Sequence, residues 1–425
     1  MSIKTMKPAV CIVGLGYVGL PLAHGFAKKG YPTIGYDIDM NRVDELQAGK
    51  DRTKELSAKD LNEVTMKLSA NPTVIAEADI VVIALPTPVD AKNKPDIAIL
   101  KAGSKTVGEN MKKGAIIVFE STVWPGTTEE ICGPILEKAS GMTCGKDFFL
   151  GYSPERINPG DKKHRLSSIV KVVSGQTPEV LKTLTELYGS VVDAGIHQAP
   201  SIKVAEMAKA IENAQRDLNI AYINEIAMLC GKIGIASKDV LDAASTKWNF
   251  LRFTPGLVGG HCIGVDPYYL VEKAKEYGMD THIITAGRTV NEKMAGVVAD
   301  QIHAAIGGKG KKILVLGLTF KEDVPDTRNS KSGDVIAALE KHGHTVLAHD
   351  PYMPSATVEK NGWKTGTVEE GSYDAIVLLV PHKEYLALGV EGLLGAVKSG
   401  AVIYDLKSML DGKAIAKAGR KYLAL

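Results

Sequence analysis

An apolar run that leads into a glycine-rich turn restricts the fold of this chain more than any other feature. Residues 9–13 are all apolar, residues 14–19 read Gly-Leu-Gly-Tyr-Val-Gly, and a helical pattern follows to about residue 29. A second strand pattern, residues 33–37, ends in an aspartate. Continuous apolar runs are typical of parallel strands that are buried on both faces. The pattern therefore predicts a strand, a helix and a second parallel strand at the start of an α/β sheet.

The glycine spacing also predicts a ligand. Gly14, Gly16 and Gly19 stand between strand and helix, and Asp37 follows at the offset of about 20 residues that marks a dinucleotide fingerprint. Such glycines let a pyrophosphate approach backbone N–H groups, and the carboxylate holds the adenosine ribose. An aspartate disfavours a 2′-phosphate, so we expect NAD rather than NADP. Glycine-rich packing without a ligand is the weaker alternative in this context.

Further strand patterns recur at 79–85, 115–119, 147–150 and 169–173, with helical stretches between several of them. This alternation predicts a doubly wound α/β sheet, in which ligands bind beyond the carboxyl ends of the strands. Polar loops follow three of these strands, at 86–88, 120–123 and 152–156. We expect these loops to share one cleft, although each is compatible with an ordinary surface loop.

A long helical pattern covers residues 201–230, about 45 Å at about 1.5 Å per residue. This length suits a helix that bridges domains or subunits. Lys209, Asn213 and Arg216 share one face of it. A cation and an amide donor on one face could stabilise an oxyanion. The alternative is a solvated polar face.

A cysteine lies in a glycine-dense loop at residues 256–264, and Asp266 and Pro267 then start a predicted helix that ends near residue 277. A position just before a helix N-terminus favours a thiolate, the form of cysteine that attacks carbonyl carbon. A small buried residue is the alternative for Cys262. The preceding residues 248–255 are rich in aromatic residues and include Arg252, which favours a loop that covers a ligand over simple core packing.

After a basic, glycine-rich junction at 307–312, a second α/β unit is predicted from strands at 313–316, 345–348, 375–380 and 401–404. Only one fingerprint glycine follows its first strand, so we do not expect this unit to bind a dinucleotide pyrophosphate. Lys321 and Arg328 could meet phosphates, or could pair on the surface with Asp323 and Asp326.

Composition excludes several classes of function. A length of 425 residues predicts about three domains, and a net charge of +2 without a basic block gives no support to nucleic-acid or membrane binding. The 5 cysteines form no CxxC pair, so we expect a reducing, cytoplasmic compartment and neither a disulfide framework nor a zinc site. The histidines show no metal-ligand spacing.

Six motifs act together as a signature. They are Gly14-x-Gly16-x-x-Gly19, Ser121-Thr122-Val123, Pro154-Glu155, Lys209-x3-Asn213, Gly259-Gly260-His261-Cys262 with Asp266, and Phe320-Lys321 to Asp326-Thr327-Arg328. With them the chain resembles, over essentially its whole length, the UDP-glucose/GDP-mannose dehydrogenase family. Its cysteine motif is similar to that of the subgroup that oxidises UDP-N-acetylhexosamines.

The resemblance implies two Rossmann-like doubly wound sheets joined by a central helical domain. We expect an NAD-binding domain at 1–198, a helical dimerisation domain with the cysteine loop at 199–306, and a UDP-sugar-binding domain at 307–425. It also implies a homodimer through the helix at 201–230, a cytoplasmic location, and no metal, nucleic-acid or membrane partner.

The resemblance assigns residues to roles. Cys262 would be the nucleophile, Lys209 and Asn213 the oxyanion stabilisers, and Thr122, Glu155 and Asp266 the groups that hold or activate water. NAD would be bound by Gly14, Gly16, Tyr17, Val18, Gly19, Asp37, Arg42, Thr87, Thr122 and Arg328. The UDP-sugar would be bound by Glu155, Arg156, Lys209, Asn213, Arg216, Phe250, Arg252, Gly259 and Lys321.

The implied reaction is the four-electron oxidation of the C6 hydroxyl of a UDP-N-acetylhexosamine, with UDP-N-acetylglucosamine expected, to a uronic acid for surface polysaccharide synthesis. UDP-N-acetylgalactosamine, UDP-N-acetylmannosamine and UDP-glucose are alternative substrates. A β-hydroxyacid dehydrogenase, which performs one two-electron step and needs neither Cys262 nor a second nucleotide domain, is an alternative enzyme. A non-enzymatic NAD-sensing module is a further alternative.

Overall fold

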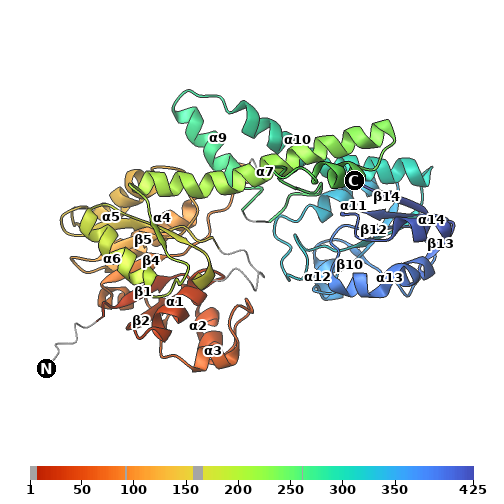
Figure 1. The fold of residues 1–425 in the computed structure, drawn as a ribbon. Coiled ribbons are helices and arrows are strands. Elements are labelled where there is room, and N and C mark those ends of the chain that lie inside the picture. Colours follow the sequence, from red (N-terminus) through yellow and green to blue (C-terminus); the bar gives the residue numbers. More distant parts are fainter. Residues whose placement is uncertain (1–6, 91–92, 157–165, 261) are drawn as a thin grey trace. The chain divides into compact units, whose positions relative to one another are not determined.

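The computed structural model describes residues 7–90, 93–156, 166–260 and 262–425 (Figure 1). The chain forms two compact units. The first contains residues 1–212 and 268–279, and the second contains residues 213–267 and 280–425. Among the described residues, no helix combines the length and the apolar character needed to cross a bilayer.

The first unit is built on an eight-stranded sheet with strand order β3-β2-β1-β4-β5-β6-β7-β8. The described pairs are parallel apart from β6 and β7, which are antiparallel. The predicted doubly wound α/β sheet is therefore confirmed. The strands are β1 (Val10–Val13), β2 (Thr33–Tyr36), β3 (Lys67–Ser69), β4 (Ile80–Ile83), β5 (Ile116–Phe119), β6 (Phe149–Tyr152), β7 (Lys171–Gly175) and β8 (Ile196–Gln198).

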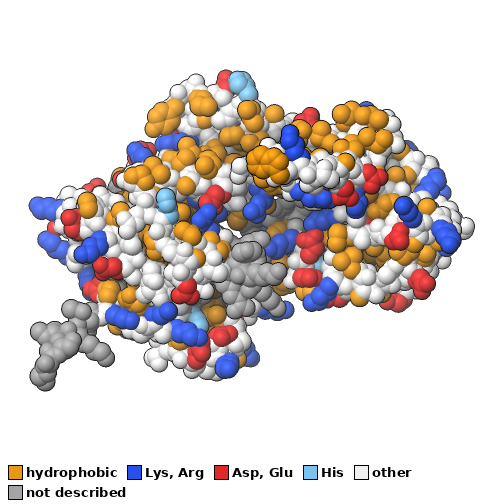
Figure 2. All heavy atoms as spheres, in the orientation of Figure 1, with side chains coloured by type: hydrophobic (Ala, Val, Ile, Leu, Met, Phe, Trp, Pro, Cys, Tyr) orange, Lys and Arg blue, Asp and Glu red, His pale blue; other side chains and the backbone are white. Residues whose placement is uncertain are grey.

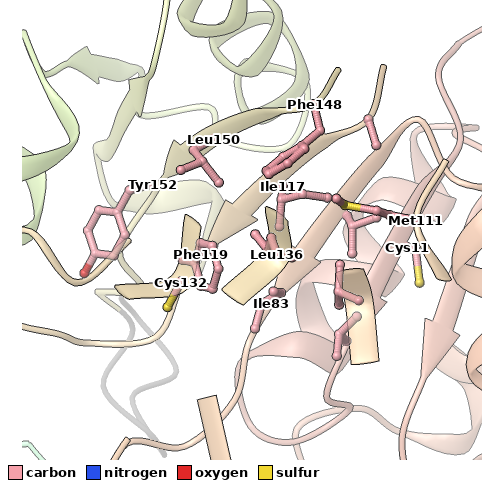
Figure 3. Packing of buried hydrophobic residues seen from close by; sticks show 14 of the residues in the cluster. Cys11, Ile83, Met111, Ile117, Phe119, Cys132, Leu136, Phe148, Leu150 and Tyr152 are labelled. Atoms are coloured by element: carbon pink, nitrogen blue, oxygen red, sulfur yellow. The ribbon is translucent and has the colours of Figure 1, made fainter. Parts of the chain in front are cut away.

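Both faces of this sheet are covered, which explains the continuous apolar runs. Along β1, Cys11 and Val13 pack into one core, while Val10 and Ile12 pack into the core on the other face. Figure 3 shows the first of these cores, in which Phe119 of β5 lies beside Leu136 of the helix at 133–140. The helices are α1 (Gly19–Lys28), α2 (Met40–Gln47), α3 (Ala58–Asn62), α4 (Ala98–Asn110), α5 (Gly133–Ser140) and α6 (Pro178–Gly189).

The second unit contains a six-stranded parallel sheet with the order β11-β10-β9-β12-β13-β14. Its six strands follow the same crossover order as the first six positions of the eight-stranded sheet. The strands are β9 (Lys312–Leu316), β10 (Thr345–His349), β11 (Lys364–Thr365), β12 (Tyr373–Leu378), β13 (Val397–Asp405) and β14 (Lys421–Ala424). The helices are α8 (Ser237–Ala244), α10 (His282–Ile306), α11 (Ser332–Lys341), α12 (Ser355–Lys360), α13 (Lys383–Gly395) and α14 (Gly412–Lys417).

The predicted long helix is α7 (Ile202–Ile233), of 32 residues, and the predicted helix after the cysteine loop is α9 (Asp266–Glu276) (Figure 1). One face of α7 carries polar residues that are nonetheless buried. They recur at intervals of three, four or seven positions, which places them on one side of a helix with about 3.6 residues per turn. They are Glu206, Lys209, Asn213, Asp217 and Asn224.

The first of these residues fastens α7 to a loop that follows β5 in the first unit. The Glu206 carboxylate accepts hydrogen bonds from the backbone N–H groups of Gly126 (2.6 Å) and Thr128 (2.9 Å). These N–H groups belong to the start of a short helical turn, η2 (Thr127–Cys132), which has no helical partner for them. Burial raises the pKa of Glu206 to about 7, even though both amide donors favour the carboxylate.

We predict that Glu206→Ala lowers the free energy of unfolding by about 2 kcal/mol, because it leaves two buried N–H groups without an acceptor. Chemical denaturation of both proteins measures the difference. The control is Glu109→Ala, which removes an exposed glutamate from α4 and should change stability little. An equal, small effect of both substitutions would contradict the role given to Glu206.

Candidate functional site

The glycine-rich turn after β1 contains two glycines that the fold requires and one that it does not. Gly14 has a φ of +93°, and a Cβ there would lie 2.7 Å from the Ala84 carbonyl oxygen. A Cβ on Gly19 would lie 1.9 Å from the Gly14 carbonyl oxygen. Gly16 is exposed, and a Cβ there would meet no atom within 4 Å. Gly16 therefore leaves open space beside the backbone, as an approaching pyrophosphate requires.

The groups beside this turn also fit a dinucleotide. Asp37, directly after β2, accepts hydrogen bonds from the N–H groups of Leu15 (2.8 Å) and Asp39 (3.0 Å). Arg42 is buried, and it donates to the Leu15 carbonyl (2.9 Å) and to Asp51 (2.8 Å). Its Nη1 is buried and makes no hydrogen bond to the described residues. An acid at the tip of β2 and a spare guanidinium N–H thus flank the turn, where Tyr17 and Val18 lead into α1.

Two of the three predicted strand-end loops are joined directly. Thr87 Oγ1 donates to the Thr122 carbonyl (2.7 Å), and Ser121 Oγ donates to the Leu85 carbonyl (2.6 Å). The loops lie side by side because β4 and β5 are neighbours. The structure therefore brings together Thr87 and Thr122, which the sequence assigned to the same cofactor.

The third loop, which contains Glu155, is linked to Glu120 at the end of β5 through Lys171, a residue that the sequence analysis did not identify. Lys171, on β7, lies 2.9 Å from Glu155 and 3.0 Å from Glu120, and Tyr188 donates to the other oxygen of Glu120 (2.6 Å). Burial alone would lower the pKa of Lys171, but the two carboxylates outweigh it and raise the pKa. Burial raises the pKa of Glu120. A lysine inside an apolar strand was the signal for this network.

The predicted polar face of α7 divides into buried and exposed members. Lys209 is 7% exposed and Asn213 is 9% exposed, so a solvated face does not describe them. Arg216, two turns along from Lys209, is exposed. The side-chain amide of Asn213 donates to Asp266 (2.5 Å), which is 2% exposed. The structure thus brings Asn213 and Asp266 together.

The cysteine loop presents its thiol outward. Cys262 is exposed, so the alternative that it is a small buried residue is wrong. Its carbonyl accepts from the N–H groups of Val265 (3.0 Å) and Asp266 (2.9 Å), which places Cys262 in the turn directly before α9. His261, which precedes it in the motif, lies outside the described residues.

The same loop packs against the loop that follows β9. A Cβ on Gly259 would lie 2.6 Å from the Asn329 carbonyl oxygen, and a Cβ on Gly260, whose φ is +83°, would lie 2.8 Å from the Phe320 ring. Only glycines allow this approach. The cysteine loop and the loop that carries Lys321 are therefore neighbours within the second unit.

The other predicted arginines bind carboxylates within their own units. Arg156 pairs with Glu212 (2.8 Å) and Arg252 pairs with Asp242. Arg328 pairs with Asp326 (2.7 Å). This ion pair is one of the two alternatives that the sequence allowed for Arg328, the other being contact with a phosphate. Phe250 is half-buried.

Comparisons with known proteins agree over the whole chain. Residues 8–192 match the NAD binding domain of the UDP-glucose/GDP-mannose dehydrogenase family, residues 203–293 its central domain, and residues 314–412 its UDP binding domain. The chain is 48% identical over 410 residues to a UDP-N-acetyl-D-glucosamine 6-dehydrogenase of Pseudomonas aeruginosa, covering 95% of this chain and 97% of the relative. A protein of the same name from Salmonella typhi is 45% identical over 412 residues, again covering 95% and 97%.

Among solved structures, a UDP-D-ManNAc dehydrogenase from Pyrococcus horikoshii superposes with a TM-score of 0.89. It is 29% identical and covers 98% of both chains.

We predict that alanine at two glycines of the turn separates ligand binding from folding. Gly16→Ala should leave the thermal unfolding midpoint unchanged and weaken NAD binding at least tenfold, because its methyl group fills the space open to the ligand. Gly19→Ala should lower the unfolding midpoint, because its methyl group meets the Gly14 carbonyl. Calorimetric NAD titration and thermal melts measure both. Normal NAD binding by Gly16→Ala would contradict this interpretation.

Proposed function

Because the chain belongs to the UDP-glucose/GDP-mannose dehydrogenase family, and is thereby an NAD-dependent UDP-sugar dehydrogenase, we propose that it oxidises the C6 hydroxyl of UDP-N-acetylglucosamine to the carboxylic acid. The observation that carries the chemistry is the exposed Cys262 in the turn directly before α9, close in the chain to Asp266 of the buried Asn213–Asp266 pair. The sugar specificity rests on the two relatives of that name at 48% and 45% identity.

Cys262 would hold the intermediate of the reaction covalently. Oxidising a primary alcohol to an acid removes two hydrides from one carbon, and the intermediate aldehyde must stay bound. Bound NAD supplies the hydride acceptor. The Cys262 thiolate adds to the aldehyde carbon and gives a thiohemiacetal, which still carries the C–H bond needed for the second oxidation. Loss of that hydride leaves a thioester, which water hydrolyses to the acid and the free thiol.

The other candidate residues would take roles that follow from their donors and charges. The ammonium of Lys209 and the second N–H of the Asn213 amide would stabilise the oxyanion, since the first N–H already binds Asp266. Thr122 and the carboxylate of Glu155 would hold and activate the hydrolytic water. Lys171 favours the ionised form of Glu155, which a base requires. Lys321 and Arg252 would contact the UDP-sugar, and Asp37 would select NAD.

The arrangement of the chain supports further proposals. We assign the NAD-binding domain to 1–198, the central domain to 199–306 and the UDP-sugar domain to 307–425. The described cysteines form no disulfide, which favours a reducing compartment and therefore the cytoplasm. A nucleotide-activated uronic acid is a glycosyl donor, so the product would supply the synthesis of a surface polysaccharide.

We further propose a homodimer through α7. The face of α7 opposite its buried polar residues carries exposed apolar side chains, and Figure 2 shows apolar side chains along this helix. A large exposed apolar stripe marks a protein interface. Its members are Val204 (46% exposed), Met207 (44%), Ile211 (51%), Tyr222 (59%), Leu229 (51%) and Ile233 (61%).

We predict that each molecule of UDP-N-acetylglucosamine consumed yields two NADH and a 6-carboxylate. The NADH-to-sugar ratio at completion, with the product identified by mass, measures this, and a panel of UDP-sugars tests the specificity. Cys262→Ser should keep NAD and substrate binding but lower acid formation at least a thousandfold, because a hydroxyl is a far weaker nucleophile. Cys144→Ser is the matched control and should retain activity. A ratio of one with an aldehyde product would contradict the mechanism.

We predict that Leu229→Glu converts the dimer to a monomer at micromolar concentration, because it places a charge inside the proposed interface. Ile99→Glu, which changes an apolar residue of α4 with similar exposure (45%), should leave the dimer intact. Sedimentation velocity distinguishes the two. A wild-type chain that sediments as a monomer would remove the proposal.

A further inference from the structure

The second sheet repeats the frame of the first, strand by strand. In the first sheet Val13 pairs with Tyr36 and Ile83, and in the second Leu316 pairs with His349 and Leu378. The residues that follow these strands therefore correspond between the sheets. The corresponding pairs are Gly14 and Gly317, Leu15 and Leu318, Gly16 and Thr319, Asp37 and Asp350, and Thr87 and His382.

Two features of this frame are shared. Gly14 and Gly317 both have a φ of +93°, and a Cβ on either would collide with the segment after the neighbouring strand. Asp350 accepts from the N–H of Leu318 (2.6 Å), as Asp37 accepts from Leu15 (2.8 Å). The second unit thus keeps the turn and the acid of a dinucleotide site.

The space that the first frame leaves open is filled in the second. Where the first unit has Gly16, the second has Thr319, and where the first has Thr87, the second has His382, which is completely buried. His382 Nε2 lies 3.0 Å from Asp350 and 3.1 Å from Thr319 Oγ1. Its ring therefore stands between the acid and the turn. A dinucleotide cannot enter this frame without displacing the ring.

The hydrogen bonds define the state of this imidazole. The backbone N–H of Asp323 donates to His382 Nδ1 (3.0 Å), so Nδ1 carries a lone pair and the proton of the neutral ring is on Nε2. The Nε2–H then points to Asp350 and Thr319. Burial alone would raise the pKa of Asp350, but His382 and the backbone N–H donors outweigh it and lower the pKa. An ionised Asp350 is the acceptor that this tautomer needs.

These contacts hold both ends of one short loop. His382 binds Thr319 at its start and Asp323 at its end, and Thr319 Oγ1 donates to the carbonyl of Lys321 within it (3.0 Å). Asp323 has a φ of +57°, a conformation that a residue other than glycine rarely adopts without outside support. Lys321 is therefore carried by a loop whose shape depends on His382.

We propose that His382 is a positioning residue for the nucleotide of the substrate. Its neutral imidazole occupies the place that the first unit leaves open to a dinucleotide, and it fixes the 319–323 loop so that Lys321 meets the diphosphate of the UDP-sugar. The inference rests on the role proposed above for Lys321. It explains how one frame serves two ligands, because filling the inner site leaves only the outer surface of the loop for a nucleoside diphosphate.

Calorimetric titration of the full-length protein with UDP tests the proposal. His382→Ala should weaken UDP binding at least tenfold and raise the KM for the UDP-sugar by a similar factor, while the KM for NAD stays unchanged. His382→Asn should recover part of the affinity, because its side-chain oxygen can accept from Asp323. The matched control is His349→Ala, which removes a neighbouring imidazole that binds Tyr385 rather than the loop, and which should leave UDP affinity unchanged.

A UDP affinity within twofold of wild type in folded His382→Ala would overturn the proposal. Nitrogen-15 spectra of histidine-labelled wild-type protein give a second test that needs no alanine variant, since a protonated Nδ1 on His382 would also overturn it. Lys321→Ala examines the underlying assumption separately. Normal UDP binding by that variant would contradict the role of Lys321, whatever the result at His382.

Discussion

Several segments of the candidate site depend on the buried polar face of α7. A buried polar group must find a partner, and the partners of this face come from the segments that carry the chemistry. Glu206 holds the loop that follows Thr122, Asn213 holds Asp266 at the start of α9, and Asn224 holds Gly256 at the entrance to the cysteine loop. Asp217 binds Arg288 and Asn291 of α10. Within each unit, α7 therefore fastens loops of that unit by directional hydrogen bonds.

This use of α7 reverses the usual amphipathic pattern, and it limits what sequence could predict. Strands such as residues 10–13 and 80–83 were predicted closely because an apolar core on each face leaves an unbroken apolar run. The turn at 14–19 was predicted from its glycine spacing, in which Gly14 and Gly19 are required by close backbone contacts and Gly16 leaves space for a ligand. The inner face of α7 could not be identified, because periodicity shows that polar and apolar faces exist and does not show which one is covered.

The partners of the buried charged residues could not be predicted from the sequence either. Lys171 meets Glu120 and Glu155 across 51 and 16 positions of sequence, and His382 meets Asp350 and Asp323 across 32 and 59. No local pattern specifies such pairs, since they arise only when the sheet brings the ends of several strands to one edge. The sequence nonetheless contained two signals of these buried pairs. A lysine within an apolar strand, and a second aspartate at the tip of the second strand of a repeated unit, are exceptions to the apolar pattern.

The two sheets show how one backbone frame can be given different ligands by few side chains. Both keep the left-handed glycine and the aspartate that receives the next N–H group, so the turn itself is a property of the frame and not of NAD. What differs is the space inside the turn, open at Gly16 and filled by Thr319 and His382. Asp37 faces an open turn and can bind ribose. Asp350 is hydrogen-bonded to the buried imidazole of His382 and stabilises its own loop instead. Whether this aspartate binds a ligand or stabilises a loop thus depends on which other groups can hydrogen-bond to its carboxylate oxygens.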